Sequence, residues 1–256
     1  MSAPEDLILG WHAVLAALKQ RPDRVEAVWF AAERRASGAS RDLMELARTA
    51  HVKFHRVPRA KLDKLAAGAR HQGIVARVKA EMVRGDKELA EFLANLPEKP
   101  LLLVLDGVQD PHNLGACLRS ADAAGAHAVV IPRDGAVSVT AAARKVAAGA
   151  AETLPVFRVT NLTRALKQLK ESGVWLVGAS PDADEDLFSA DLRGPLALVL
   201  GGEGKGLRRL TREACDRLVR IPMAGAVESL NVSVAAGVCL FEAVRQHQRS
   251  GRLRLG

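Results

Sequence analysis

Residues 221–245 read IPMAGAVESLNVSVAAGVCLFEAVR, and this stretch decides how the rest of the chain is interpreted. Its first part is irregular and rich in small residues, whereas its second part places apolar residues at helical spacing from Val232 to Leu240. Ser229 and Asn231 stand just ahead of the apolar run, and both are residue types that cap helix N-termini. The stretch predicts a loop that opens toward a ligand and leads into a buried helix. Taken alone, an ordinary loop before a buried helix is the simpler interpretation.

A glycine-rich loop stands upstream of this stretch, in LALVLGGEGKGLRRL at residues 196–210. The segment from Leu196 to Leu200 is typical of a buried strand, and the glycines that follow allow positive φ or close approach of the backbone to another group. The loop is not a phosphate-binding P-loop, because Lys205 is followed by Gly206 and not by Ser or Thr. It also lacks the GxGxxG spacing of a dinucleotide site.

A third segment, LLLVLDGVQDPHNLGACLRSADAAGA at residues 101–126, contains an apolar strand that ends at Asp106, a polar turn with Asn113, and a helix that presents Arg119. Together the three segments resemble motifs 1, 2 and 3 of the SpoU/TrmH branch of the SPOUT methyltransferases. The resemblance covers roughly residues 100–247. The ordered set NLGACLR, GGEGKG and IPM…SLNVS carries it.

The chain has 256 residues, with 37 Lys and Arg against 29 Asp and Glu, which gives a formal net charge of +8. This balance favours a polyanionic partner such as RNA. No apolar run has the length of a membrane span, and the N-terminus lacks a signal-peptide pattern. Cys117, Cys215 and Cys239 have no CxxC spacing and are typical of small core residues in a reducing compartment, so we expect a cytoplasmic protein.

Residues 7–80 have the pattern of a small α/β unit. Ile8 to Leu18 contain a Gly10-Trp11-His12 start and the apolar spacing of a first helix, and a last strand follows His71. The resemblance identifies this part with the small, L30e-like RNA-binding domain that precedes the catalytic domain in ribosomal RNA 2′-O-methyltransferases. A similar His-Gln-Gly turn occurs in that domain. We therefore expect an RNA substrate-binding domain (1–81), a linker with a short helix (82–98) and a methyltransferase domain (99–256).

From residue 101 onward strands and helices alternate, which predicts an α/β domain with a parallel sheet and helices on both faces. The predicted strands are Leu101–Leu105, His127–Ile131, Leu154–Val159, Val174–Gly178 and Leu196–Leu200. The predicted helices are Asn113–Ala124, Thr140–Ala148, Leu162–Glu171 and Leu207–Asp216. The resemblance adds that this is an α/β-knot domain, in which the C-terminal segment threads through a loop to form a trefoil knot.

The resemblance implies S-adenosylmethionine (SAM) as the cofactor. Methyl transfer requires the donor and the attacking oxygen to be held in line. The adenine of SAM needs an apolar slot lined by backbone polar groups, and the glycine loop and the IPM…SLN stretch offer small or apolar residues with accessible main chain. The expected cofactor-binding residues are Leu200, Gly201, Gly202, Gly204, Ile221, Pro222, Met223, Leu230 and Val232.

Arg119 stands at the position of the family's catalytic arginine, although the same residue also fits a surface partner for Asp122. The resemblance casts it as the base that activates a ribose 2′-OH. A guanidinium has a pKa above about 12 and so stays protonated at neutral pH, where it cannot act as a base. Binding the phosphate next to the ribose and stabilising the forming alkoxide fits an arginine better. The remaining expected catalytic residues are Asn113, Asn231, Glu203 and Ser229. The two asparagines would fix the geometry of the site through amide hydrogen bonds. Glu203 would orient Arg119 or receive a proton, and Ser229 would contact the ribose or cap the helix.

Other chemistries find little support. His51 and His55 are four residues apart, but they fall on a predicted strand and no carboxylate pair completes a metal site, so no metal is expected. No GxSxG motif and no His/Cys dyad is visible.

The resemblance implies transfer of a methyl group from SAM to the ribose 2′-OH of a guanosine in 23S ribosomal RNA. A tRNA 2′-O-methyltransferase and a non-catalytic RNA-binding or ribosome-assembly protein stay open as alternatives. The resemblance also implies a homodimer through the C-terminal domains. The helix after Asn231 supports it, because apolar residues extend well around its circumference, and we expect Ala236 and Val238 at the interface.

Overall fold

The computed structural model describes residues 7–32, 38–78, 84–96 and 99–249, and the chain forms two compact units. The first unit comprises Met1–Met82 and, in addition, Val139–Thr153. The second comprises Val83–Ser138 and Leu154–Gly256. Of the predicted linker, residues 82–83 and 97–98 lie outside the described residues, and α4 (Asp86–Leu93) is its helix.

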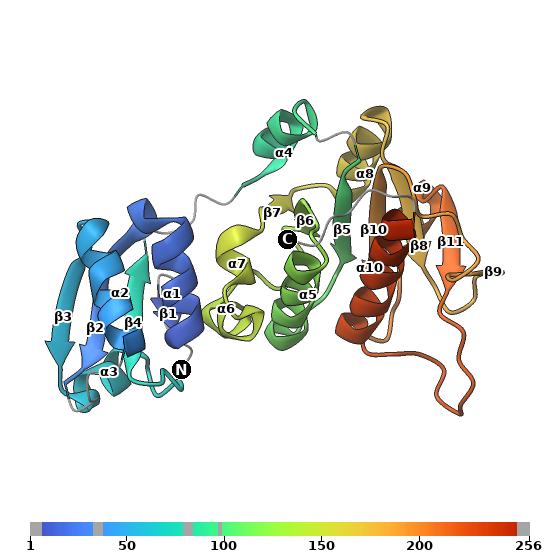
Figure 1. Ribbon diagram of the computed structural model, residues 1–256. Coiled ribbons are helices and arrows are strands. Elements are labelled where there is room, and N and C mark those ends of the chain that lie inside the picture. Colours follow the sequence, from blue (N-terminus) through green and yellow to red (C-terminus); the bar gives the residue numbers. More distant parts are fainter. Residues whose placement is uncertain (1–6, 33–37, 79–83, 97–98, 250–256) are drawn as a thin grey trace. The chain divides into compact units, whose positions relative to one another are not determined.

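The first unit is built on a four-stranded sheet of order β1-β4-β2-β3 (Figure 1). Helices α1 and α2 cover one face through a cluster around Val14, Leu43 and Phe30, and α3 covers the other through Leu62. The strands are β1 (Leu7–Leu9), β2 (Val25–Ala31), β3 (Lys53–Val57) and β4 (Ile74–Val78). The helices are α1 (Trp11–Gln20), α2 (Gly38–Thr49) and α3 (Arg59–Leu65), with a 3-10 turn at Pro22–Arg24.

The first helix begins at Trp11, inside the Gly10-Trp11-His12 start expected from the sequence, whereas the strand ahead of it was not predicted. Leu7–Leu9 form β1, which pairs antiparallel with β4, and α1 begins at Trp11 after Gly10 adopts a φ of 97°. The His-Gln-Gly turn fixes this corner, because the Gln72 side-chain oxygen accepts a hydrogen bond from the Trp11 backbone N–H at 3.1 Å. A buried His71 anchors the same turn: its Nδ1 accepts from the Gly73 N–H and its Nε2 donates to Asp63.

Two short helices from later in the chain complete the first unit. They are α6 (Ala141–Ala147) and α7 (Ala150–Thr153). Between them Gly149 comes so close to α1 that an added Cβ would lie 2.8 Å from the Ala16 Cβ. A buried ion pair, Arg144 to Glu152 at 2.5 Å, ties the two helices together.

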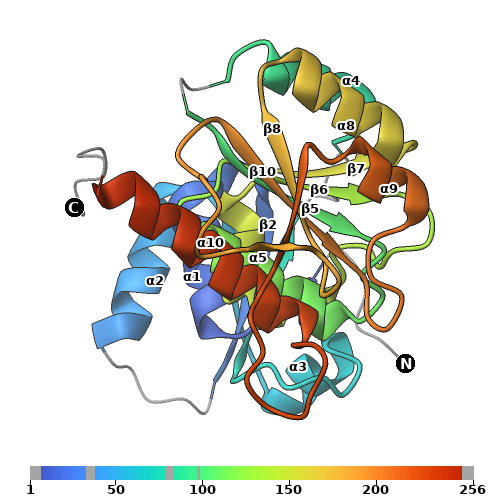
Figure 2. The same cartoon turned by 90° about the vertical axis from the view of Figure 1, so that its right-hand side faces the viewer.

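The second unit confirms the predicted parallel sheet covered on both faces (Figures 1 and 2). Its seven strands have the order β7-β6-β5-β10-β8-β11-β9, and every pairing between them is parallel. The strands are β5 (Leu101–Asp106), β6 (Ala128–Pro132), β7 (Val156–Val159), β8 (Trp175–Ala179), β9 (Glu185–Asp186), β10 (Leu196–Gly201) and β11 (Arg217–Arg220). The short strands β9 and β11 were not predicted.

Helices pack on both faces of this sheet. Helices α4 and α8 bury one face through a cluster that includes Leu89, Leu166, Val104 and Val199, and α5 packs against α10 on the other. Helix bounds are α5 (Pro111–Ala123), α8 (Leu162–Glu171), α9 (Arg209–Ala214) and α10 (Val232–Arg249). Within α10, Ala236 is fully buried in its own unit, so the expectation that it lies at a dimer interface is wrong.

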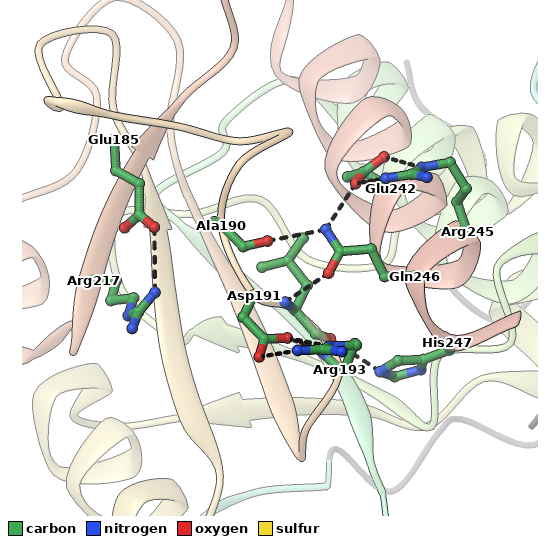
Figure 3. Close-up of polar contacts among 10 residues, drawn as sticks. Glu185, Ala190, Asp191, Arg193, Arg217, Glu242, Arg245, Gln246 and His247 are labelled. Carbon is green, nitrogen blue, oxygen red and sulfur yellow. Dashed lines mark hydrogen bonds and ion pairs between the residues drawn. The ribbon is translucent and has the colours of Figure 1, made fainter. Parts of the chain in front are cut away.

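The segment between β9 and β10 crosses α10 and is hydrogen-bonded to it (Figures 2 and 3). The Gln246 amide donates to the Ala190 carbonyl at 3.0 Å and accepts from the Leu192 N–H at 2.9 Å, while His247 contacts the Leu192 carbonyl at 3.0 Å. The buried carboxylate of Glu242 holds Gln246 in place at 2.7 Å. These contacts set α10 within the connection from β8 to β10, which is the threading that the resemblance to a knotted domain implies.

Two adjacent glycines at the end of β10 allow close backbone approach, Gly201 to the glycine loop itself and Gly202 to the turn after β5. A Cβ on Gly201 would lie 2.0 Å from the backbone carbon of Gly206, and a Cβ on Gly202 would lie 2.4 Å from the Gly107 carbonyl oxygen. The Gly202 N–H also donates to the Asp106 carbonyl at 2.9 Å. Because the opposing atoms are backbone, they cannot move aside as a flexible side chain would.

We expect Gly202→Ala to destabilise the protein by about 1–3 kcal/mol or more, the usual cost of overpacking. For a domain of this size that lowers the thermal midpoint by about 2–4 °C for each kcal/mol. Calorimetric unfolding measures it, with Gly194→Ala as the matched control, since nothing lies within 4 Å of a Cβ there. Equal midpoints for the two variants would contradict the role given to this contact.

Candidate functional site

A pocket of about 450 Å³ opens at the carboxyl ends of β8, β10 and β11. Its walls are the end of β8 at Ala179–Pro181, the glycine loop from Leu200 to Gly206, the loop that follows β11, and the first turn of α10. The carboxyl edge of a parallel sheet is the usual place for ligands in open α/β folds, and the volume is in the range of small-molecule sites.

The pocket has an apolar wall and an acidic rim. Leu200, Ile221, Leu230 and Val232 supply apolar surface, and the glycines expose their backbone beside it. The charged side chains among the lining residues are Glu203 and Glu228. Since both are carboxylates, the pocket is suited to a ligand with an apolar or aromatic part and net positive charge, and not to a phosphate-bearing nucleotide.

A chain of amide hydrogen bonds joins the three sequence segments at the mouth of the pocket. The Asn113 amide on α5 donates to Glu203 at 2.6 Å, and the Asn231 amide donates to the Asn113 side-chain oxygen at 3.0 Å. Asn231 in turn caps α10 by accepting from the N–H and hydroxyl of Ser233. Glu203 and Asn231 follow Asn113 by 90 and 118 positions in the sequence, and the three side chains thus fix one another's orientation.

A buried carboxylate closes the base of the glycine loop. Asp106, at the end of β5, has a fully buried side chain that accepts from both the backbone N–H and the guanidinium of Arg208. The Arg208 side chain is half exposed, so the pair stabilises the loop without burying two full charges. The glycine loop is therefore held at both of its ends.

The wall contributed by β8 has its own support. The Ser180 hydroxyl donates to Asp182, and the Arg212 guanidinium on α9 donates to both of them, at 2.9 Å to Ser180 and 2.8 Å to Asp182. Hydrogen bonds from Arg212 and then from Ser180 lower the pKa of Asp182 to about 2. The carboxylate is therefore charged at neutral pH, and Arg212 holds the position of Ser180 in the pocket wall.

Nucleophilic thiol chemistry has no support at this site. Burial, with a smaller effect of the Glu203 charge, raises the pKa of the Cys117 thiol to about 12. Burial likewise raises the pKa values of Cys215 and Cys239 to about 12. Within the part of the chain that the structure describes, no cluster of three or more His, Cys, Asp or Glu side chains could hold a metal ion.

The structure brings most of the predicted site residues together. All of the expected cofactor-binding residues except Pro222 line the pocket, as do Glu203, Ser229 and Asn231. Asn113 reaches the pocket through Glu203 and Asn231. Arg119 lies exposed on α5 and does not line it.

Several lining residues were not predicted. Ala179, Ser180 and Pro181 follow β8, and Glu228 and Ala235 flank the predicted positions. The Ser-Pro step after a predicted buried strand was the one available signal for the β8 wall. No motif marks it, because its place beside the glycine loop follows from the strand order.

Two family matches cover nearly the whole chain. Residues 100–241 match the SpoU rRNA Methylase family, and residues 7–83 match the family described as RNA 2′-O ribose methyltransferase substrate binding. No helix in the described ranges combines the length and apolar character that crossing a membrane requires.

Characterised relatives match over almost their full length. The 23S rRNA (guanosine-2′-O-)-methyltransferase RlmB of Shewanella oneidensis is 52% identical over 244 residues, covering 95% of this chain and 98% of the relative. The protein of the same name from Ralstonia nicotianae is 53% identical over 240 residues, covering 94% and 95%. Among solved structures, the SpoU methyltransferase AviRb from Streptomyces viridochromogenes in complex with the cofactor AdoMet is 27% identical, with a TM-score of 0.79, covering 95% of this chain and 90% of that one.

We expect Asn113→Asp to destabilise the protein more than Asn113→Ala at neutral pH. Alanine removes two exposed hydrogen bonds, at a cost of about 1 kcal/mol, whereas aspartate sets a second carboxylate 2.6 Å from Glu203. Thermal unfolding of both variants measures the difference.

The matched control pair is Asn95→Ala and Asn95→Asp, at an exposed asparagine whose amide donates to the Glu91 carbonyl. The Asn95 amide contacts a backbone carbonyl and not a carboxylate, so the two control variants should differ less than the Asn113 pair. If the Asn113 variants unfold together, the amide chain does not hold the pocket mouth.

Proposed function

Because the chain belongs to the SpoU rRNA Methylase family, we infer that it transfers a methyl group from SAM to the ribose 2′-OH of a guanosine in 23S ribosomal RNA. The observation that carries this conclusion is the identity of about half of all residues with 23S rRNA guanosine-2′-O-methyltransferases across both domains. We propose that the protein acts in the cytoplasm.

The pocket fits SAM by its shape and by the sign of its charge. The apolar wall and the exposed glycine backbone suit the adenine of SAM. The carboxylates of Glu203 and Glu228 suit the net positive charge of SAM, which has a sulfonium and an ammonium group but only one carboxylate. When bound, SAM supplies a methyl group on an electrophilic sulfur. We propose that Leu200, Gly201, Gly202, Gly204, Ile221, Pro222, Met223, Leu230 and Val232 form the cofactor site, with Pro222 fixing the loop from outside the pocket.

We propose that Asn113, Glu203, Ser229 and Asn231 position the reacting ribose. The amide chain fixes the direction in which Glu203 points, and Ser229 lines the same pocket. We propose that the guanidinium of Arg119 holds the phosphate next to the target ribose and stabilises the alkoxide that develops there.

We propose that the protein acts as a homodimer through the surface of α10. Val234 and Phe241 on this helix are each 50% exposed, two turns apart, with the half-buried Val238 between them. An isologous contact would bring this stripe together with its copy. Because α5 packs against α10, the contact would also bring the exposed Arg119 of one protomer near the other protomer, which accounts for an arginine that does not line its own pocket.

Methylation of transcribed 23S rRNA with SAM tests the function. We expect incorporation at a guanosine ribose, mapped as a linkage that resists alkaline cleavage. Arg119→Ala should lower kcat/KM by about 10²–10³-fold, the usual effect of losing one transition-state charge contact, while SAM still binds in calorimetry. Arg164→Ala, an exposed helix arginine of the same unit, is the matched control. Methyl incorporation into a base or only into tRNA would contradict the substrate, and absence of SAM binding would indicate an RNA-binding protein.

Light scattering tests the dimer. We expect Phe241→Arg and Val234→Arg to yield monomers with reduced methyl transfer, because each sets a charge in an apolar contact. Leu210→Arg, at a residue of α9 that is also 50% exposed, should leave the dimer intact. A wild-type protein that is monomeric and fully active at micromolar concentration would rule this proposal out.

A further inference from the structure

The sheet of the first unit carries a stack of side chains on one face. The rings of Trp29 on β2 and His55 on β3 lie 5.7 Å apart between centroids and only 21° from parallel. The Arg77 guanidinium, on β4, lies 5.3 Å from the Trp29 ring centroid. In the sheet, β2 lies between β4 and β3 (Figure 1). The guanidinium and the imidazole therefore approach Trp29 from the neighbouring strands on either side.

Strand register places a further cation beside this stack. Ala27 on β2 is paired with both Arg77 and Lys53, and the next outward-facing pair on β2 and β3 is Trp29 with His55. Side chains two residues apart on a strand share a face, so Lys53, His55, Trp29 and Arg77 lie on the same face. Helix α3 covers the further end of that face, where Ala31 and Val57 join its cluster with Leu62.

The two ends of the stack differ in exposure. Trp29 and Arg77 are half-buried, whereas His55 and Lys53 are exposed on β3, the last strand in the sheet order. The ring face of His55 that does not meet Trp29 therefore points toward the edge of the sheet. Trp29, itself in contact with Arg77, supports one face of the imidazole before any ligand arrives.

The charge of these strands favours an anionic ligand. The four strands contain one acidic residue, Glu26, against Lys53, Arg56 and Arg77. Base stacking on an aromatic ring beside cationic side chains is the recurrent way in which proteins bind unpaired nucleotides. A base-paired duplex cannot present a base face to such a ring, because its bases are already stacked.

We propose that this face is a binding site for single-stranded RNA, in which an unpaired base stacks on His55 as the next layer after Arg77 and Trp29, and Lys53 contacts a phosphate. The site rests on the proposed function, since an enzyme that modifies ribosomal RNA has such a substrate. It lies on the first unit and is separate from the SAM pocket of the second. Through this site the protein would bind an unpaired segment of its RNA substrate.

Binding of a short single-stranded oligoribonucleotide that contains 2-aminopurine, measured with the full chain and without SAM, tests the site. We expect quenching of the fluorescent base and tighter binding than for the same strand annealed to its complement. His55→Ala should abolish the quenching and weaken binding about 5- to 100-fold, as the loss of one base stack does. His55→Phe, which keeps an aromatic ring, should retain both.

His51→Asn is the matched control, because His51 is also exposed and close in sequence, and asparagine tolerates its φ of 54°. Thermal midpoints of all variants show whether the unit remains folded. An unchanged RNA affinity in a folded His55→Ala protein overturns the proposal and assigns the face to some other partner.

Methyl transfer separates this proposal from the proposed function. His55→Ala should raise the KM for RNA and leave kcat unchanged, since the stack belongs to the first unit and the pocket for the reaction to the second. An active wild-type enzyme whose KM does not respond to His55→Ala overturns the RNA site and leaves the function standing. A protein that binds single-stranded RNA through His55 but transfers no methyl group contradicts the function and supports the site.

Discussion

The pocket depends on how closely two parallel strands approach at their carboxyl ends. Gly202 packs its Cα against the Gly107 carbonyl and donates its N–H to Asp106, which leaves no room for a side chain. Because α5 follows β5 directly and the glycine loop follows β10, this contact between the two strand ends places the start of α5 beside the glycine loop. The amide chain from Asn231 through Asn113 to Glu203 then becomes possible. A backbone contact thus sets the position of side chains that come from three distant parts of the sequence.

The net charge of the chain and the charge of the pocket lining have opposite signs. The chain as a whole carries a net charge of +8, but the charged side chains that line the pocket are the carboxylates Glu203 and Glu228. The long-range field therefore attracts a polyanion, while the pocket itself favours a cationic cofactor and disfavours phosphate. Phosphate groups of RNA are therefore disfavoured inside the cofactor pocket.

Sequence reasoning located the pocket well because its residues occur in three ordered motifs, and nearly all of the expected cofactor residues line one cavity. It was less successful where local pattern is ambiguous. The strand at Leu7–Leu9 was not predicted, because an apolar run of three residues carries too little pattern and its pairing with β4 is a contact between distant residues. Ala179–Pro181 carry no motif, since the strand order alone brings them to the glycine loop. The burial of Ala236 could not be seen either, because apolar residues occur all around α10.

The first unit is discontinuous, and this has a consequence for biosynthesis. Helices α6 and α7 belong to it, yet they are translated only after β5, α5 and β6 of the second unit. A nascent chain that has just passed residue 82 therefore exposes the part of α1 around Ala16 that Gly149 later covers. The ribosome must add some seventy further residues, at about 5–20 residues per second, before that surface can close. Folding of the two units is consequently interleaved during translation, and a fragment cut at their apparent boundary is an incomplete unit.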